Sequence, residues 1–228
     1  SFKLDGLAKS DILESKKSIT FRITFYYSNN TVSTNNELKS ILNFKFDLPG
    51  TLINNNLEKN LVFGRSMPKS EIETIYTLDN IDVPETAIAT WDATQEQNGT
   101  ITAWILDEDN NGLYELYIGT PTGAISLPGN SGWFFSYYNN VKNIDTTHLD
   151  TSQVTNVSYM FHNCTYLTSI DFNQATFEKV TSFDYMFGVI KANIYIVVKD
   201  DTARNWLQNR LNESGSFGTI VTVAELES

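Results

Sequence analysis

The chain has 228 residues, of which 41% are hydrophobic and 13% aromatic, enough to bury the core of one large domain or two small ones. Sixteen Lys and Arg residues stand against twenty-seven Asp and Glu residues, so the formal net charge is −11 at pH 7. An acidic surface repels phosphate backbones and anionic lipid headgroups, which makes nucleic acids and membrane surfaces poor candidate partners. The acidic residues are scattered rather than blocked, as is typical of a solubility feature.

The one cysteine, Cys164, excludes an internal disulfide and a multi-cysteine metal site. No apolar run reaches the roughly 18 residues that a membrane-spanning helix needs. The chain opens with SFKLDG, without an initiator Met or a basic and then apolar leader. We interpret it as an excised or processed segment whose targeting signals lie outside this sequence.

Two stretches near the N-terminus alternate between apolar and polar side chains, SITFRITFYY at 18–27 and LKSILNFKFDL at 38–48. This alternation predicts two half-buried strands, joined by the turn-rich SNNTVSTNNE. They resemble the closing strands of Ig-like sandwich modules in bacterial surface proteins. Two strands alone do not make a stable domain. We predict a sandwich-like module over residues 1–50, with a boundary near Pro49 and the polar residues 54–60.

The next segment, residues 51–130, predicts a β-meander that caps the region after it. EIETIYTLD at 71–79, TITAWIL at 100–106 and LYELYIG at 113–119 read as three strands. Asn98-Gly99 introduces the second strand, and DEDNNG joins the second to the third as a hairpin.

The hairpin turn also matches part of a calcium-loop pattern. Positions 1, 3, 5, 6 and 9 of that pattern are Asp107, Asp109, Asn111, Gly112 and Glu115. Position 12, where the pattern needs a bidentate Glu, is Ile118, and no helices flank the loop. A tight hairpin turn needs the same Asp, Asn and Gly residues. A weak cation site at Asp107, Asp109, Asn111 and Glu115 stays open, and we expect calcium not to be required for folding.

The segment from residue 131 to the C-terminus contains an internal repeat. Phe135, Phe161 and Phe187 are separated by steps of 26 residues. The same step relates the aromatic residues two positions before them, which are Trp133, Tyr159 and Tyr185. A fixed period of this length is typical of leucine-rich-type solenoids. We therefore expect the three Phe rings to form one internal column.

Within one repeat unit the apolar spacing predicts two short pieces of structure. The i, i+3, i+6, i+7 set, which is Val154, Val157, Met160 and Phe161, indicates one face of a short helix. Thr151 or Ser152 is the expected N-cap. Leu167 and Ile170 belong to a brief strand, and Cys164 falls at a core position, where a thiol acts as a small hydrophobe.

The last residues predict a cap for the repeats. DDTARNWLQNRLNES at 200–214 indicates a helix with Asp201 or Thr202 as N-cap, and TIVTVAEL at 219–226 indicates a final strand. The expected helical face consists of Ala203, Trp206, Leu207 and Leu211. A helix and strand after the last unit cover apolar faces that an open end exposes. The whole chain is thus predicted to be α+β and mainly β, with a repeat region over 131–228.

The repeat resembles a known family. LDTSQVTNVSYMFHNCTYLTSID at 149–171 is similar to the 26-residue BspA-like leucine-rich repeat of bacterial surface proteins and mycoplasma-type lipoproteins. The likeness extends over about residues 62–225 and includes Trp91-Asp92 and the aromatic GWFFSYY. The next unit departs from the pattern at Ile190 and Asn193, as a degenerate last coil would.

The resemblance implies an exported module attached to a bacterial cell surface, working in adhesion or recognition rather than catalysis. The expected partner is a protein or a glycan, including one from a host, and no cofactor is expected. The alternative is a purely structural stalk or shell component. A carbohydrate-active enzyme is a third interpretation, and glycosidase chemistry needs two carboxylates held around a sugar.

Two further sets of residues are candidates for chemistry. His162 lies two residues before Cys164, but a Cys–His nucleophile needs an accessible thiol of low pKa, which a core position does not supply. Tyr138 and Tyr166, where exposed, are the candidate ring faces for stacking on a sugar or a peptide.

Overall fold

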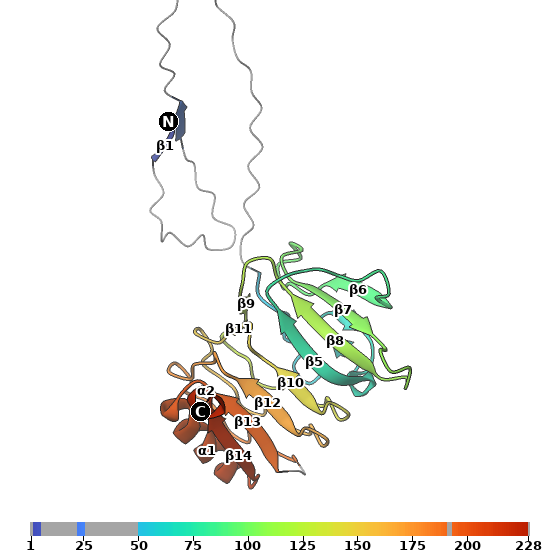
Figure 1. Ribbon diagram of the computed structural model, residues 1–228, viewed down its shortest axis with the longest axis vertical. Coiled ribbons are helices and arrows are strands. Elements are labelled where there is room, and N and C mark those ends of the chain that lie inside the picture. The colour runs from blue at the N-terminus through green and yellow to red at the C-terminus, as the bar shows by residue number, and fades with distance from the viewer. Residues whose placement is uncertain (1, 6–21, 26–49, 191–192, 228) are drawn as a thin grey trace, which may run out of the picture. The chain divides into compact units, whose positions relative to one another are not determined.

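The computed structural model describes residues 2–5, 22–25, 50–190 and 193–227 (Figure 1). The chain divides into two compact units, Ser1–Leu48 and Pro49–Ser228. In the first unit β1 (Phe2–Asp5) pairs antiparallel with β2 (Arg22–Phe25), with Phe2 opposite Phe25. β2 falls within the strand predicted at 18–27, whereas its partner β1 was not predicted. The strand predicted at 38–48 lies outside the described residues.

The second unit is built on one eight-stranded sheet in the order β14-β13-β12-β10-β5-β8-β7-β6. Its strands in chain order are β5 (Ile72–Leu78), β6 (Ala89–Asp92), β7 (Thr102–Leu106), β8 (Tyr114–Gly119), β10 (Asn143–Asp145), β12 (Ser169–Phe172), β13 (Ile194–Val198) and β14 (Gly218–Thr222). Two small pairs accompany it: β3 (Leu61–Val62) with β4 (Arg65–Ser66), and β9 (Ile125–Ser126) with β11 (Leu149–Asp150). A single 3-10 turn, Lys69–Glu71, precedes β5. The described part is therefore mainly β with few helices, which confirms the predicted fold class at that level.

The three strands predicted before the repeats are present as β5, β7 and β8, but they do not form a simple meander. β6, β7 and β8 follow one another antiparallel. β5 pairs parallel with β8 on one side and with β10 on the other. β5 is buried along most of its length, while Tyr76 and Leu78 are half-buried. Alternation predicts a strand but does not say which strands become its neighbours.

The repeat units stack in parallel with the period read from the sequence. Asn143, Ile144 and Asp145 of β10 pair with the residues 26 positions later in β12, and β12 pairs with β13 at the same offset. One row of buried side chains crosses the sheet from strand to strand, namely Ile105, Leu116, Ile75, Ile144, Ile170 and Ile196. This row is the centre of the core that joins the repeats to the strands before them.

The short helices predicted inside the repeat units are wrong. Residues 158–163 form consecutive turns, in which Tyr159 and Asn163 have φ of 59° and 63°. The N–H groups of Tyr159 and Phe161 donate to carbonyl oxygens of the next unit, at 2.8 and 2.9 Å. Thr151 is no N-cap either, because its hydroxyl donates to the Thr176 carbonyl oxygen at 3.0 Å. The apolar spacing identified which side chains are buried, but a turn buries the same residues and pairs its backbone with the neighbouring unit instead of within itself.

The predicted column of rings is confirmed. Phe135 and Phe161 stack with centroids 5.4 Å apart and planes 11° from parallel, and Phe161 and Phe187 with centroids 5.6 Å apart and planes 8° from parallel. All three side chains are fully buried. Cys164 is also buried and is a free thiol, as predicted, and its Sγ donates to the Phe135 carbonyl oxygen at 2.9 Å.

The C-terminal helix is confirmed as α1 (Asp201–Glu213), which packs against β13 and β14 (Figure 1). Its N-cap is Asp200, one residue before the predicted position, and the Asp200 carboxylate accepts from the Ala203 N–H at 3.0 Å. The predicted final strand is shorter than expected. β14 ends at Thr222, and a four-residue helix, α2 (Val223–Leu226), follows it.

Candidate functional site

A ladder of aromatic rings runs along the turns of the stacked units, and we call it the aromatic ladder: Trp133, Tyr137, Tyr159 and Tyr185. Trp133 stacks on Tyr159 with centroids 4.2 Å apart, and Tyr159 on Tyr185 with centroids 5.5 Å apart. Tyr137 stacks on Trp133 at 6.3 Å. The first three rings are half-buried, while Tyr185 at the end of the ladder is 56% exposed. Tyr185 thus offers a flat ring to solvent.

The backbone of the ladder is left-handed at equivalent points of three units. Trp133, Tyr159 and Tyr185 have φ of 61°, 59° and 50°. Non-glycine residues avoid this region, at a cost of about 1–2 kcal/mol each, and such residues concentrate at functional sites. Here the geometry also satisfies the backbone, because the Trp133 N–H donates to the Ser158 carbonyl oxygen at 3.0 Å.

His162 lies against the ladder. Its ring is edge-on to Trp133 and Tyr159, at centroid distances of 5.4 and 5.5 Å. Burial lowers the pKa of His162, so the imidazole is neutral at pH 7. Gly188 is required beside it, because a Cβ at that position would lie 2.6 Å from His162 Nδ1.

The structure separates the two tyrosines proposed as stacking faces. Tyr166 is 58% exposed, so its ring is accessible. Tyr138 is fully buried and stacks against Phe63 with centroids 6.4 Å apart. Tyr138 therefore has no face for a ligand. Tyr138 stands 26 residues before Cys164, so the period of the repeat indicates a core position for it. The 26-residue period of Trp133, Tyr159 and Tyr185 was the signal that could have identified the ladder instead.

A buried polar cluster lies beneath Tyr138. Lys69 is 1% exposed, and its Nζ donates to the carbonyl oxygens of Asn56 at 3.2 Å and Ser136 at 3.1 Å. The same Nζ lies 5.1 Å from the centre of the Tyr138 ring. Burial lowers the pKa of Lys69 to about 8 and raises the pKa of Cys164 to about 12. A thiol of such high pKa, buried beside a carbonyl, is a packing residue rather than a nucleophile.

The candidate calcium residues form a closed hairpin turn. The Asp107 carboxylate accepts from the N–H groups of Asn111 at 3.0 Å and Gly112 at 3.2 Å. Asp109 Oδ1 accepts from the Asn111 N–H at 3.1 Å, and Glu115 accepts from the Glu108 N–H at 3.0 Å. These bonds use the carboxylates to hold the turn, which is the role that the hairpin interpretation assigns to them.

One carboxylate beside this turn was missed. Glu73 occupies the irregular position of β5, where the pairing with β8 shifts between Ile72 and Thr74. A bulge of this kind re-aims a side chain, and Glu73 meets Asp109 and Glu115, with one carboxylate oxygen of each within 4.8 Å of the others. Lys142 Nζ donates to Glu73 at 2.7 Å. This bond, more than any other cause, lowers the pKa of Glu73. The sequence holds no signal for a bulge at this residue.

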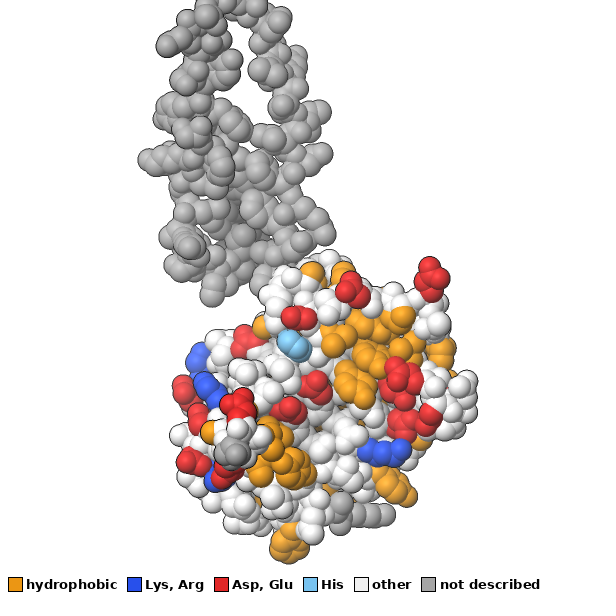
Figure 2. All heavy atoms as spheres, viewed as in Figure 1, with side chains coloured by type: hydrophobic (Ala, Val, Ile, Leu, Met, Phe, Trp, Pro, Cys, Tyr) orange, Lys and Arg blue, Asp and Glu red, His pale blue; other side chains and the backbone are white. Residues whose placement is uncertain are grey.

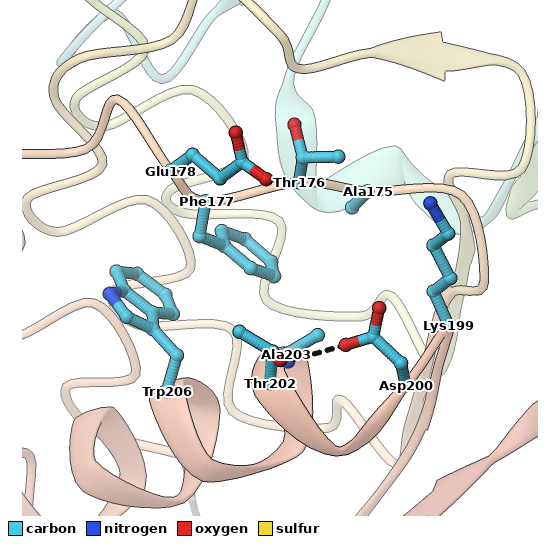
Figure 3. Close-up of a pocket in the computed structure, with 9 residues that line it drawn as sticks. All are labelled: Ala175, Thr176, Phe177, Glu178, Lys199, Asp200, Thr202, Ala203 and Trp206. Carbon is cyan, nitrogen blue, oxygen red and sulfur yellow. Dashed lines mark hydrogen bonds between the residues drawn. The ribbon is translucent and has the colours of Figure 1, made fainter.

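A hollow of about 180 Å³ lies at the start of α1 (Figure 3). Phe177 and Trp206 line one side, stacked with centroids 4.4 Å apart, and Lys199, Asp200 and Thr202 line the other. Arg210 covers the Trp206 ring, 5.0 Å from its centre. The Trp206 ring is therefore covered by Phe177 and Arg210, and the hollow offers little ring face for stacking on a ligand.

Comparison of the chain with family models, with curated proteins and with solved structures gave no match. Among the described residues, none of the helices has the length and apolar character needed to cross a membrane. The resemblance to BspA-like repeats therefore rests on the residues quoted for it.

Proposed function

We propose that this chain is part of a bacterial cell-surface protein, exported from the cell, and that it recognises a protein or glycan partner by binding rather than by catalysis. In this proposal the 26-residue units form a short leucine-rich-type solenoid of the BspA-like kind. The in-register pairing of β10, β12 and β13 supports the solenoid, because residues 26 apart occupy equivalent points of successive coils.

The observation that carries the proposal is the aromatic ladder. Stacking of the coils lines up Trp133, Tyr159 and Tyr185 along one edge, and the last ring is 56% exposed. A flat aromatic ring with a polar hydroxyl is the type of group enriched at binding surfaces, because it gives large contact area at small entropic cost.

The test is a screen of the full chain against glycan and protein arrays, with Tyr185→Ala as the binding variant. Tyr195→Ala is the matched control, because Tyr195 is also an exposed tyrosine, 39% accessible, on β13. We expect a ligand whose binding Tyr185→Ala weakens by at least about fivefold while Tyr195→Ala leaves it unchanged, the range of an exposed aromatic contact. Absence of any ligand supports the stalk or shell alternative, and turnover of a glycan supports the enzyme.

A further inference from the structure

The charge of the chain is concentrated in one stretch. Residues 70–141 contain eleven Asp and Glu residues and no Lys or Arg. They carry a formal net charge of −11, while residues 1–69 sum to +4 and residues 142–228 to −4. The acidic residues are spread along this stretch, but no basic residue offsets them. This stretch supplies β5, β6, β7 and β8, so the acidity belongs to one region of the sheet.

The outward face of these strands carries an aromatic row. Alternation places Ile105, Leu116 and Ile75 in the core, so their neighbours face the other side. Trp104, Tyr117 and Tyr76 are register partners across β7, β8 and β5. Tyr117 stacks on Tyr76 with centroids 4.9 Å apart and on Trp104 with centroids 5.6 Å apart. Trp104 is buried, with 2% of its surface exposed, so Tyr76 and Tyr117, which are half-buried, are the rings of this row that reach solvent.

A second apolar row lies beside the first. Ile88 is 56% exposed, and Leu106 is half-buried on β7. Figure 2 shows a hydrophobic patch over β5, β7 and β8 with acidic side chains next to it. We call this surface the acidic sheet face: Tyr76, Ile88, Leu106 and Tyr117, with the carboxylates Glu73, Asp107, Glu108, Asp109 and Glu115 around them. A contiguous exposed apolar patch rimmed by polar groups is typical of an interaction site.

Among the described residues, the rim contains the cation Lys142. Lys142 is bonded to Glu73, and the Tyr117 hydroxyl donates to Glu108 at 2.8 Å. Burial, with the nearby carboxylates of Glu108 and Glu115, raises the pKa of both Tyr76 and Tyr117. The electrostatic potential at the two tyrosine rings is therefore negative, and a ligand that stacks on them is exposed to it.

A hollow opens at the edge of the acidic sheet face. It measures about 420 Å³ and is lined by Thr86, Ile88, Leu106, Asp107, Glu108 and Asn110. Ile88 and Leu106 supply an aliphatic floor, while Asp107 and Glu108 supply carboxylates. Lys and Arg side chains have the complementary form, since an apolar stem lies on apolar surface while the cationic head stays among polar groups. Arg also forms bidentate bonds with carboxylates and stacks on aromatic faces.

We propose that the acidic sheet face docks a Lys- or Arg-rich polypeptide segment of a partner protein. This proposal deepens the recognition function proposed above and rests on it only in requiring a protein partner. Charge complementarity selects the occupant, because a neutral or acidic peptide gains nothing from the rim and an anionic ligand is repelled. Aliphatic stems cover Ile88 and Leu106, and cationic heads meet Asp107 and Glu108.

The test uses the full chain and a short fluorescent peptide of alternating Arg and Leu, with alternating Glu and Leu as its counterpart. Binding is measured by fluorescence anisotropy at physiological salt, where charges beyond about 8 Å are screened. We expect binding of the basic peptide alone. Glu108→Gln and Ile88→Ser should each weaken it by about tenfold, because one removes a carboxylate and the other the apolar floor. Melting temperatures confirm that each variant is folded.

The matched control is Glu178→Gln, which removes the same charge from an exposed residue outside the acidic stretch. Weakening by Glu178→Gln as large as that by Glu108→Gln indicates unspecific attraction and overturns the proposal, as does the absence of basic-peptide binding. Calcium that raises the melting temperature while the peptide does not bind also overturns it, in favour of a cation site. If the arrays give a partner that Tyr185→Ala weakens but Ile88→Ser does not, this proposal fails while the recognition function stands.

Discussion

The two halves of the eight-stranded sheet form one continuous sheet, but only one of them is built from a repeated sequence. The strands β10, β12 and β13 come from a repeated sequence, so every residue faces its counterpart 26 positions away. The strands β5 to β8 share no repeat, and their order places β5 between β8 and β10. The repeated half lines up identical or similar side chains, and residues 142–228 carry a formal net charge of −4. The unrepeated half is more acidic, with −11 over residues 70–141, and carries an aromatic row on the face opposite the core. In the repeated half, the 26-residue period determines which side chains pack on one another. In the unrepeated half, no repeat constrains the residues on either face of the sheet.

The largest expected effect is in the repeated half. Phe161 stacks on Phe135 and Phe187 and meets Phe172 edge-on at 5.8 Å. Phe161→Ala removes the ring and leaves a cavity, so we expect a loss of about 3–5 kcal/mol in the free energy of unfolding. Phe187→Ala should cost less, because that ring ends the column. Denaturant unfolding followed by Trp fluorescence measures both, and a near-neutral Phe161→Ala would contradict the solenoid.

The next effect concerns the junction of the two halves, where Lys69 donates to the Ser136 carbonyl oxygen. Its pKa is lowered from 10.5 to about 8 by burial. Between these values the unfolded chain holds a proton that the folded chain has released, so stability rises with pH. The burial penalty is fully present below about pH 8 and is relieved by about 3 kcal/mol towards pH 10.5.

The measurement is the difference in unfolding free energy between wild type and Lys69→Met from pH 7 to 10. Only this difference isolates Lys69, because the raised pKa of Cys164 acts in the opposite direction: above about pH 9 the unfolded thiol loses its proton first, and stability falls. Lys59→Met serves as the exposed-lysine control. If the difference in unfolding free energy does not change between pH 7 and 10, the pKa of Lys69 is not lowered in the folded chain.

A smaller effect is expected at the end of the repeated half. The Asp200 carboxylate caps α1 through the Ala203 N–H. Asp200→Ala should cost about 1 kcal/mol, because one helix N–H loses its acceptor, and Asp200→Asn should restore most of it. Thermal unfolding compares the two. Equal losses in both variants would show that the charge, rather than the cap, matters.

The sequence predicted which residues of the repeats are buried, but it did not predict the conformation of their backbone. The 26-residue step predicted the Phe column and the core place of Cys164, because side-chain equivalence is written directly in the residues. It did not predict the left-handed φ of Trp133 or Tyr159, since that region is rarely occupied by aromatic residues and is stabilised by bonds between coils. Likewise, alternation predicted β5 but not its parallel neighbours, which depend on contacts with β10, some 70 residues away.

The candidate site shows the same division. Asp107, Asp109, Asn111 and Glu115 lie together as one turn because they are close in sequence and have turn chemistry. Glu73 joins them through a bulge and a long-range pairing, neither of which leaves a local signal. The burial of Tyr138, by contrast, follows from the repeat, because Tyr138 stands 26 residues before the buried Cys164.

The smallest expected effect is that of calcium on the unrepeated half, where we expect a shift in melting temperature close to zero. Ile118 stands where the calcium-loop pattern needs its bidentate ligand, and it is fully buried in the core. A neighbouring carboxylate cannot take this place unless β8 unfolds. Asp107 is engaged with two backbone N–H groups, and Glu73 is paired with Lys142. A cation would have to displace Lys142 and break the turn, which offsets its attraction to the carboxylates.

The measurement is thermal unfolding with calcium and with a chelator, repeated on Glu73→Gln. A large rise with calcium that the chelator reverses and Glu73→Gln abolishes would show instead that Glu73, Asp109 and Glu115 bind the ion, and that the unrepeated half carries a metal site.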